Sequence, residues 1–273
     1  MTLHRHRTSL AFGQIALVVV LSSPGLAMAA DAVPTHLDFS VYAAGLNILK
    51  LQSDVDIRPD RYRINLAYRT TGLLSAVISS QIDSFAQGRW NGVHPLPIRF
   101  GSWGQLSGTN RRTEIDYVGG QPEIRALEPA SESDRDPVPA SMQRDSMDTL
   151  SAMAMLLRQV ATSGRCDGQA KMFDGRRLSE ITVRTAGTET LEAESRSSFA
   201  GPALRCEMTG RQLAGFKHDT DEAELRKPHF STAWFAPVTP GGQMLPVRVI
   251  FETRFFGHAI AYVTQAAVRA PLP

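Results

Sequence analysis

Alternation of apolar and polar residues with a period of two runs through most of this 273-residue chain. It is clearest in three early segments, residues 37–42, 49–57 and 61–69, where apolar side chains would cover one face of a strand and polar side chains the other. Pro59 and Asp60 separate the second segment from the third, and such a pair is typical of a turn. The pattern therefore predicts half-buried antiparallel strands, with a hairpin at this turn.

The same alternation recurs through the rest of the chain, interrupted by glycine-rich turns and by one segment of helical period. Further strands are expected at residues 81–89, 96–106, 112–118, 122–127, 169–173, 178–185, 190–197, 204–213, 232–235, 245–255 and 258–268. The predicted strands do not alternate with helices along this chain, which argues against a parallel βαβ fold.

The helical segment differs from the rest in its apolar pattern. Asp145 can cap a helix that runs to about Thr162, with apolar residues at i, i+3, i+4 and i+7. Met147, Met155 and Leu156 widen the apolar stripe until little polar surface is left, so the helix should be buried on several sides. The sequence thus predicts a mainly β protein. In it, a single, strongly curved antiparallel sheet, a half-barrel or β-spiral, partly wraps around one long apolar helix.

Residues 128–141 lie between the first group of strands and this helix. Three prolines and a run of charged residues interrupt any regular pattern there, which predicts a surface linker before the helix. No internal repeat marks a second domain, so we expect a single β-rich domain at residues 30–273.

The first 29 residues have the three parts of a secretory signal peptide. Arg5 and Arg7 precede an apolar run at residues 10–21, and Ala27-Met28-Ala29 is a small-residue cleavage site. The run is too short to cross a bilayer, which takes about 20 apolar residues. No cysteine follows the cleavage site for lipid attachment, and the arginines do not form a twin-arginine pair. We therefore expect export by the general secretory route to a soluble, periplasmic form without a transmembrane segment.

The charge balance of the exported part argues against a nucleic-acid partner. Two of the 29 Lys and Arg residues, and none of the 27 Asp and Glu residues, fall in the signal peptide. The mature domain therefore carries equal numbers of basic and acidic residues, without the basic excess of a nucleic-acid-binding surface.

Cys166 and Cys206 are the two cysteines of the chain. In an oxidising compartment an isolated, even pair most often forms a disulfide, and the alternative of a redox or catalytic thiol lacks both a C-x-x-C spacing and a nearby histidine. We predict a bond that joins the exit of the helix to the inner face of the C-terminal strands. A disulfide that closes a loop of about 40 residues stabilises the folded protein by roughly 4 kcal/mol in the chain-entropy treatment.

Landmarks in a fixed order along the chain resemble a family of exported bacterial proteins, domain of unknown function 3108. These landmarks are Phe39–Gly45, Met147–Val160 followed by Cys166, Phe173–Arg177, Cys206 with Gly215 and Phe216, and Met244–Arg248. The resemblance spans roughly residues 36–269 and implies a periplasmic, largely β protein of Gram-negative envelopes with no assigned chemistry. The expected shape is similar to the half-barrels of periplasmic lipoprotein and lipid carriers, an analogy of fold alone.

Motifs of familiar catalytic and metal centres are missing from the mature sequence. Ser-x-x-Lys, Gly-x-Ser-x-Gly and His-Glu-x-x-His do not occur. The acidic segment His218–Glu224 lacks the glycine and the distal glutamate of an EF-hand, so a solvated loop is favoured over a calcium site. Asp174–Arg177 could form an anion-binding turn, although Asp-Gly is also the commonest hairpin signal and we prefer that interpretation. We expect a non-enzymatic protein without a cofactor or a metal.

Two apolar features suggest a space for a ligand between sheet and helix. One follows a predicted strand and could form a lid or mouth, and the other is a helix stripe that could line an adaptable cavity. The candidate ligand-binding residues are Leu73, Leu74, Val77 and Ile78 in the first feature and Leu150, Met153 and Leu157 in the second. For each feature taken alone, plain core packing is the preferred interpretation, and the two gain weight as a ligand site only together.

The main functional hypothesis is therefore a periplasmic protein that binds an apolar or amphipathic ligand, such as a lipid or an acylated peptide, in maintenance of the cell envelope. The alternative is a scaffold or adaptor that binds another envelope protein or a cell-wall polymer. The alternative would use exposed aromatic residues such as Trp90, Trp103 and Trp234.

Overall fold

The computed structural model describes residues 33–130, 134–239, 241–253 and 257–270. All of them belong to the unit Asp31–Pro273. The predicted signal peptide and its cleavage site lie outside the described residues.

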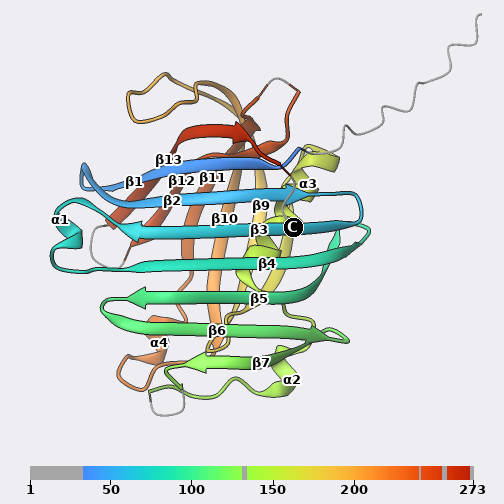
Figure 1. Cartoon of the computed structure of the whole chain (residues 1–273), viewed down its shortest axis with the longest axis vertical. Helices are drawn as coiled ribbons and strands as arrows, with labels where there is room; N and C mark the ends of the chain where they lie inside the picture. The colour runs from blue at the N-terminus through green and yellow to red at the C-terminus, as the bar shows by residue number, and fades with distance from the viewer. Residues whose placement is uncertain (1–32, 131–133, 240, 254–256, 271–273) are drawn as a thin grey trace, which may run out of the picture. The chain divides into compact units, whose positions relative to one another are not determined.

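Antiparallel strands dominate this unit, and the thirteen strands found in the described residues form one sheet (Figure 1). They are β1 (Thr35–Ala43), β2 (Leu46–Ile57), β3 (Arg61–Thr70), β4 (Gln81–Asn91), β5 (His94–Leu106), β6 (Thr109–Val118), β7 (Gln121–Glu128), β8 (Gly168–Phe173), β9 (Leu178–Leu191), β10 (Gly201–Ala214), β11 (His229–Pro237), β12 (Met244–Thr253) and β13 (Gly257–Val268). The prediction of a mainly β protein with one antiparallel sheet is confirmed.

The order of the strands shows how the two ends of the chain meet. Within the sheet the order is β7-β6-β5-β4-β3-β2-β1-β13-β12-β11-β10-β9-β8. Each strand thus pairs with its neighbours in sequence, except that β1 pairs with β13 in the middle of the sheet. The edges β7 and β8 do not pair with each other, so the sheet is open. We refer to β1–β7 as the N-terminal half and to β8–β13 as the C-terminal half.

The period-two pattern of the sequence is reproduced by the burial of the strands. Along β1 buried and partly buried residues alternate without exception, and Leu37 and Val41 are almost fully buried. The predicted hairpins at Pro59–Asp60 and at Asp174–Gly175 connect β2 to β3 and β8 to β9. One strand prediction is wrong: residues 192–200 form a loop, because β9 continues as one strand to Leu191, which pairs with Gly201 of β10.

The prediction of one long apolar helix is also wrong. The described residues hold four helices, α1 (Gly72–Ser75), α2 (Ala140–Gln143), α3 (Thr149–Ser163) and α4 (Glu222–Leu225), of which α3 is the longest at 15 residues. The helix begins later than expected because Asp148, not Asp145, is its cap. Asp145 has a φ of 60°, which takes the backbone out of the helical conformation. The last residues of α3, at positions 161–163, are exposed, so the helix is not buried all round.

Helix α3 packs against both halves of the sheet. It contacts β3, β4 and β5 of the N-terminal half and β8 and β12 of the C-terminal half. The hydrophobic core is made by inward-facing strand residues of both halves together with the helix residues Leu150, Ala154, Leu157 and Val160. The position of α3 therefore determines where side chains fill the space between the helix and the sheet.

Part of the segment predicted as a surface linker, residues 128–141, is buried. Arg135 and Val138 each have 9% of their surface exposed. The backbone N–H of Asp136 donates to the carbonyl of Phe216 (3.0 Å), and an isolated bridge pairs Arg135 with Lys217. The described part of the segment gains these partners from the chain after β10, which no local pattern in the linker itself could indicate.

Candidate functional site

A buried hydrogen-bond chain attaches the start of α3 to the N-terminal half of the sheet. The hydroxyl of Tyr62 on β3 donates to Ser151 Oγ (2.7 Å), and Ser151 Oγ donates to Asp148 Oδ2 (2.6 Å). The backbone N–H of Ser151 donates to Asp148 Oδ1 (2.8 Å), which is the cap of the helix. These groups are buried with their hydrogen bonds satisfied, so they fix the rotation of α3 about its axis.

A second attachment lies two turns further along α3. The guanidinium of Arg158 lies 4.4 Å from the ring centroid of Trp90 on β4, and it donates to the carbonyl of Arg58 (3.1 Å). Trp90 donates to the same carbonyl (3.0 Å) and packs against Tyr62 with 4.8 Å between ring centroids. The side of α3 that faces β3 and β4 is thus closely packed.

The disulfide attaches the exit of α3 to the C-terminal half. Gly164 ends the helix in the left-handed conformation, with φ of 65°, and Cys166 follows two positions later. Cys166 is bonded to Cys206 on β10, and their Cα atoms are 6.2 Å apart. This confirms the predicted disulfide and its position at the helix exit, with Cys206 fully buried.

Between α3 and the C-terminal half the packing leaves a cavity of about 450 Å³. This volume is in the range of pockets that bind small molecules in proteins. The cavity is lined by residues of α3, of the chain that follows it, of strands β8 to β12 and of the β4–β5 turn. They are Val93, His94, Thr149, Ala152, Met153, Met155, Leu156, Gln159, Cys166, Asp167, Gly168, Gln169, Ala170, Met172, Ile181, Val183, Met208, Ala233, Phe235, Pro246 and Val249.

The lining is mainly apolar and unusually rich in methionine. Four of the nine methionines of the chain line it, at positions 153, 155, 172 and 208. Methionine side chains have flexible, polarizable thioethers and adapt to ligands of different shape. The acidic residue in the lining, Asp167, is already engaged, because Thr185 donates to it through both N–H (3.0 Å) and Oγ1 (2.9 Å). These hydrogen bonds lower the pKa of Asp167.

The structure separates the seven candidate ligand-binding residues into three groups. Met153 lines the cavity. Leu150 and Leu157 are 4% and 0% exposed, belong to the packed core and are not among the cavity-lining residues. The remaining four, Leu73, Leu74, Val77 and Ile78, lie on and after α1.

The α1 residues are far from the cavity. They precede the first residue of β4, whereas Val93 and His94 of the cavity lining follow its last residue. An eleven-residue strand separates the two ends by about 35 Å. Leu73 and Val77 are 78% and 83% exposed. A contact between a ligand and any of the seven candidates, Met153 included, stays a prediction.

Sequence reasoning missed the strand side of the cavity and the Asp148 chain. Tyr62 and Ser151 are 89 positions apart, so no spacing rule connects them. The one available signal for the strand side was the inward face of β10, where Cys206 and Met208 share a direction.

Burial changes the acidity of the groups at the start of α3. It raises the pKa of Asp148 to about 6, against the opposite effect of the hydrogen bonds from Ser151. Burial and the nearby charge of Asp148 also raise the pKa of Tyr62 and of Tyr117, so both hydroxyls stay protonated. The ionised carboxylate of Asp148 is therefore the costly group in this buried chain.

Asp148 makes the stability of the fold depend on pH. Its folded-state pKa of about 6 is above the ordinary value of 3.8, so the folded protein binds more protons between these values and loses stability as pH rises through them. The difference corresponds to about 3 kcal/mol. In denaturant unfolding, we expect the stability of Asp148→Asn relative to the parent to rise by most of that amount, about 2 kcal/mol, between pH 4 and pH 7. The control Asp60→Asn, at a side chain 73% exposed, should show a constant difference, and a constant difference for Asp148→Asn would contradict this assignment.

Within the described ranges, no cluster of three or more His, Cys, Asp or Glu side chains is arranged to hold a metal ion. Of the helices in these ranges, none has the length and apolarity needed to span a membrane. The acidic segment His218–Glu224, considered above as a calcium loop, contains the start of α4, and His218 Nε2 lies 3.0 Å from Asp136 Oδ1.

The fold and the cavity together define a class of protein: an open antiparallel β-sheet with α3 packed against both of its halves and a methionine-lined apolar space between α3 and the C-terminal half. The chain matches the family described as "Protein of unknown function (DUF3108)" over residues 38–264, and it belongs to that family. The resemblance noted in the sequence is thereby confirmed. No curated protein matches the chain.

Seven chains of solved structures match this chain, and the similar structures include the following two. The first is a beta-barrel-like protein of domain of unknown function DUF1849 from Brucella abortus, with a TM-score of 0.52 and 10% identity over 88% of this chain and 100% of that one. The second is a putative outer membrane lipoprotein-sorting protein domain from Vibrio parahaemolyticus, with a TM-score of 0.23 and 6% identity over 88% and 87%. The first likeness supports the fold, and the second is too distant to support an argument.

Proposed function

We propose that this protein binds an apolar or amphipathic ligand, such as a lipid or an acylated peptide, in the cavity beside α3 and does no chemistry on it. The observation that carries the proposal is the cavity itself, about 450 Å³ with four methionines in its lining. An empty apolar space of this size forgoes the packing contacts that a filled core would gain, which disfavours leaving it vacant without a function.

The arrangement of attachments around α3 supports ligand binding. Buried hydrogen bonds and an aromatic contact hold one side of the helix to β3 and β4, and the disulfide holds its exit. The cavity-facing side is left with adaptable apolar side chains, and Asp167 there is held by Thr185. Such a site can accept an acyl chain.

Native mass spectrometry of protein purified from the periplasm tests the proposal. We expect a mature chain that begins at Ala30, as the predicted signal peptide requires, and a bound apolar molecule that organic extraction releases. A clean ligand-free mass, combined with no uptake of a fluorescent fatty acid by the purified protein, would overturn the binding proposal. A mature form that starts far from Ala30 would overturn the proposed export.

A second candidate function, an adaptor for another envelope protein, rests on the exposed apolar residues of α1. Leu73 and Val77 project into solvent, and Leu46 and Leu106 nearby are 54% and 40% exposed. The three tryptophans expected for this function do not form a shared exposed surface, because Trp234 is 5% exposed and Trp90 packs against Tyr62. Trp103, at 45% exposed, is the one that remains at the surface.

A further inference from the structure

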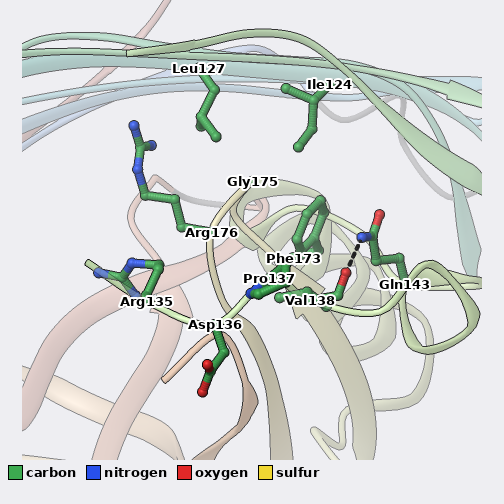
Figure 2. Close-up of a pocket in the computed structure, with 10 residues that line it drawn as sticks. All are labelled: Ile124, Leu127, Arg135, Asp136, Pro137, Val138, Gln143, Phe173, Gly175 and Arg176. Atoms are coloured by element: carbon green, nitrogen blue, oxygen red, sulfur yellow. Dashed lines mark hydrogen bonds between the residues drawn. The ribbon is translucent and has the colours of Figure 1, made fainter. Parts of the chain in front are cut away.

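A second pocket lies at the edge of the sheet, outside the cavity described above. Its volume is about 330 Å³, and none of its lining residues lines the methionine-rich cavity. The lining comes from β7, from the segment before α2, from α2 and from the β8–β9 turn (Figure 2). The lining residues are Ile124, Leu127, Arg135, Asp136, Pro137, Val138, Gln143, Phe173, Gly175 and Arg176.

Apolar and cationic groups lie on different parts of this pocket. Figure 2 shows Ile124 and Leu127 above and Phe173 and Val138 below, with the side chains of Arg135 and Arg176 together at one side. The carboxylate of Asp136 points away from the β7 residues, and it lies 3.0 Å from His218 Nε2. The pocket therefore has an apolar part and a cationic part.

The two guanidinium groups of the cationic part donate hydrogen bonds to uncharged acceptors, and Arg135 also forms an ion pair with Asp134. Arg176 donates to Thr113 Oγ1 (3.0 Å) and to the carbonyl of Pro129 (2.6 Å), and Arg135 donates to the carbonyl of Gly215 (2.9 Å). All three acceptors are uncharged. Arg135 is 9% exposed, and its Nε is buried without a hydrogen-bond partner among the described residues, 3.5 Å from Asp134 Oδ1.

A third guanidinium adds to the positive charge of this region. Burial lowers the pKa of Arg176, and the positive charges of Arg111 and Arg135 lower it further, against the effects of Asp174 and Asp134. The Nε of Arg111 is also buried without a hydrogen-bond partner in the described part of the chain. Arg135 is buried and the other two arginines are partly buried. Such cations, which repel one another, are stabilised by a bound anion, which gains charge-assisted hydrogen bonds in return.

The β8–β9 turn keeps the pocket open. Gly175 has a φ of 89°, and a Cβ atom there would lie 2.9 Å from Thr113 Cγ2 and 3.2 Å from Leu127 Cδ1. A residue with a side chain would therefore occupy the space between the turn and the β6–β7 face. Asp174–Arg177 is thus a hairpin turn that also brings Arg176 to the pocket, which joins the two interpretations of this segment.

We propose that this pocket binds a small amphipathic anion, with a carboxylate or phosphate group at Arg135 and Arg176 and an apolar part against the β7 side chains. Guanidinium groups bind carboxylate and phosphate through the same paired hydrogen bonds, so the shared feature is the anion. The site is independent of the methionine-lined cavity, and the ligands of the two sites differ in charge and size.

Calorimetric titration with octyl phosphate, octanoate, octanol and inorganic phosphate tests the proposal. We expect one or both of the octyl anions to bind at least tenfold more tightly than octanol and than inorganic phosphate, because only they satisfy both parts of the pocket. The stronger of the two identifies the head group. Equal affinity for octanol, equal affinity for inorganic phosphate, or no binding of either octyl anion overturns the proposal.

Matched variants locate the binding. Arg176→Gln should weaken binding of the octyl anion at least tenfold, whereas Arg125→Gln, an exposed arginine between the two β7 lining residues, should not. Because Arg176→Gln also loses two hydrogen bonds, a second pair isolates charge: Ile124 is 43% exposed, so Ile124→Glu and Ile124→Gln should both fold, and the glutamate should bind the anion far more weakly. Equal affinity within either pair rules out this site.

A third variant separates this proposal from the proposed function. Met153→Asp, in the other cavity, should retain anion binding at the edge pocket even if fatty-acid uptake is lost. If Met153→Asp abolishes both, the octyl anions occupy the methionine-lined cavity and the edge-pocket proposal is wrong.

Discussion

Replacing Met153 with aspartate is expected to abolish uptake of a fluorescent fatty acid while the protein stays folded. Met153 lines the cavity and is only partly buried, so water can accompany the new carboxylate into a space already large enough for a ligand. An unpaired charge in the binding space disfavours an acyl chain. We expect at least a tenfold loss of affinity with a loss of stability of no more than about 2 kcal/mol. Titration with the probe and thermal unfolding of the same sample measure both.

The neighbouring residue provides the matched control. Ala154 is 0% exposed and belongs to the solid core, so Ala154→Asp buries a charge where water cannot follow and should cost several kcal/mol. Met153→Leu, which keeps the site apolar, should retain uptake. If Met153→Asp unfolds as readily as Ala154→Asp, the space beside α3 behaves as core and the binding proposal loses its main support.

Removing the disulfide should produce the second large effect. Cys166 and Cys206 are 40 residues apart, and opening a loop of that size costs about 4 kcal/mol in the chain-entropy treatment. That is a large fraction of the stability of a typical domain. We expect the double variant Cys166→Ala, Cys206→Ala to melt at a clearly lower temperature and to bind the fatty acid more weakly, because Cys166 is part of the cavity wall.

Reduction gives an independent check of this effect. A reducing agent should lower the melting temperature of the parent protein to that of the double variant and leave the variant unchanged. Thiol labelling of the unreduced, unfolded parent should find no free thiol. Two labelled thiols would show that the bond does not form in the cell.

Much of the fold follows from local patterns in the sequence. A strand with one buried face needs period-two alternation, so β1 to β3 and their hairpin were predictable from residues 37–69. The failed strand at residues 190–197 shows the limit of the pattern. Alternation there continued past Leu191, but a strand ends where its partner does, and the pairing with β10 stops at Gly201.

The candidate site was predictable only on the helix side. An apolar stripe indicates that a helix is buried but not against what, and α3 is packed on two sides. Leu150 and Leu157 belong to the core, whereas Met153, from the same predicted stripe, lines the cavity. The exposed Leu73 and Val77 looked like a mouth because sequence gives no measure of the distance along β4 that separates α1 from the cavity.

The edge pocket depended on contacts that no sequence rule gives. Arg176 reaches Thr113, 63 positions earlier, and Arg135 reaches Gly215, 80 positions later. The motif Asp174–Arg177 is visible in the sequence. A role in anion binding also requires an apolar wall, and strand β7, paired with β6, supplies it from a distant part of the chain.

The pairing of β1 with β13 constrains the order in which the sheet can form during synthesis of the chain. Thr35 of β1 is paired with Val268 of β13. In the middle of the sheet, the first described strand of the chain therefore pairs with the last. A chain that emerges N-terminus first holds β1 with one edge vacant until the final strand has been made, and contacts this distant in sequence form slowly. The sheet therefore cannot be completed before β13 has been synthesised.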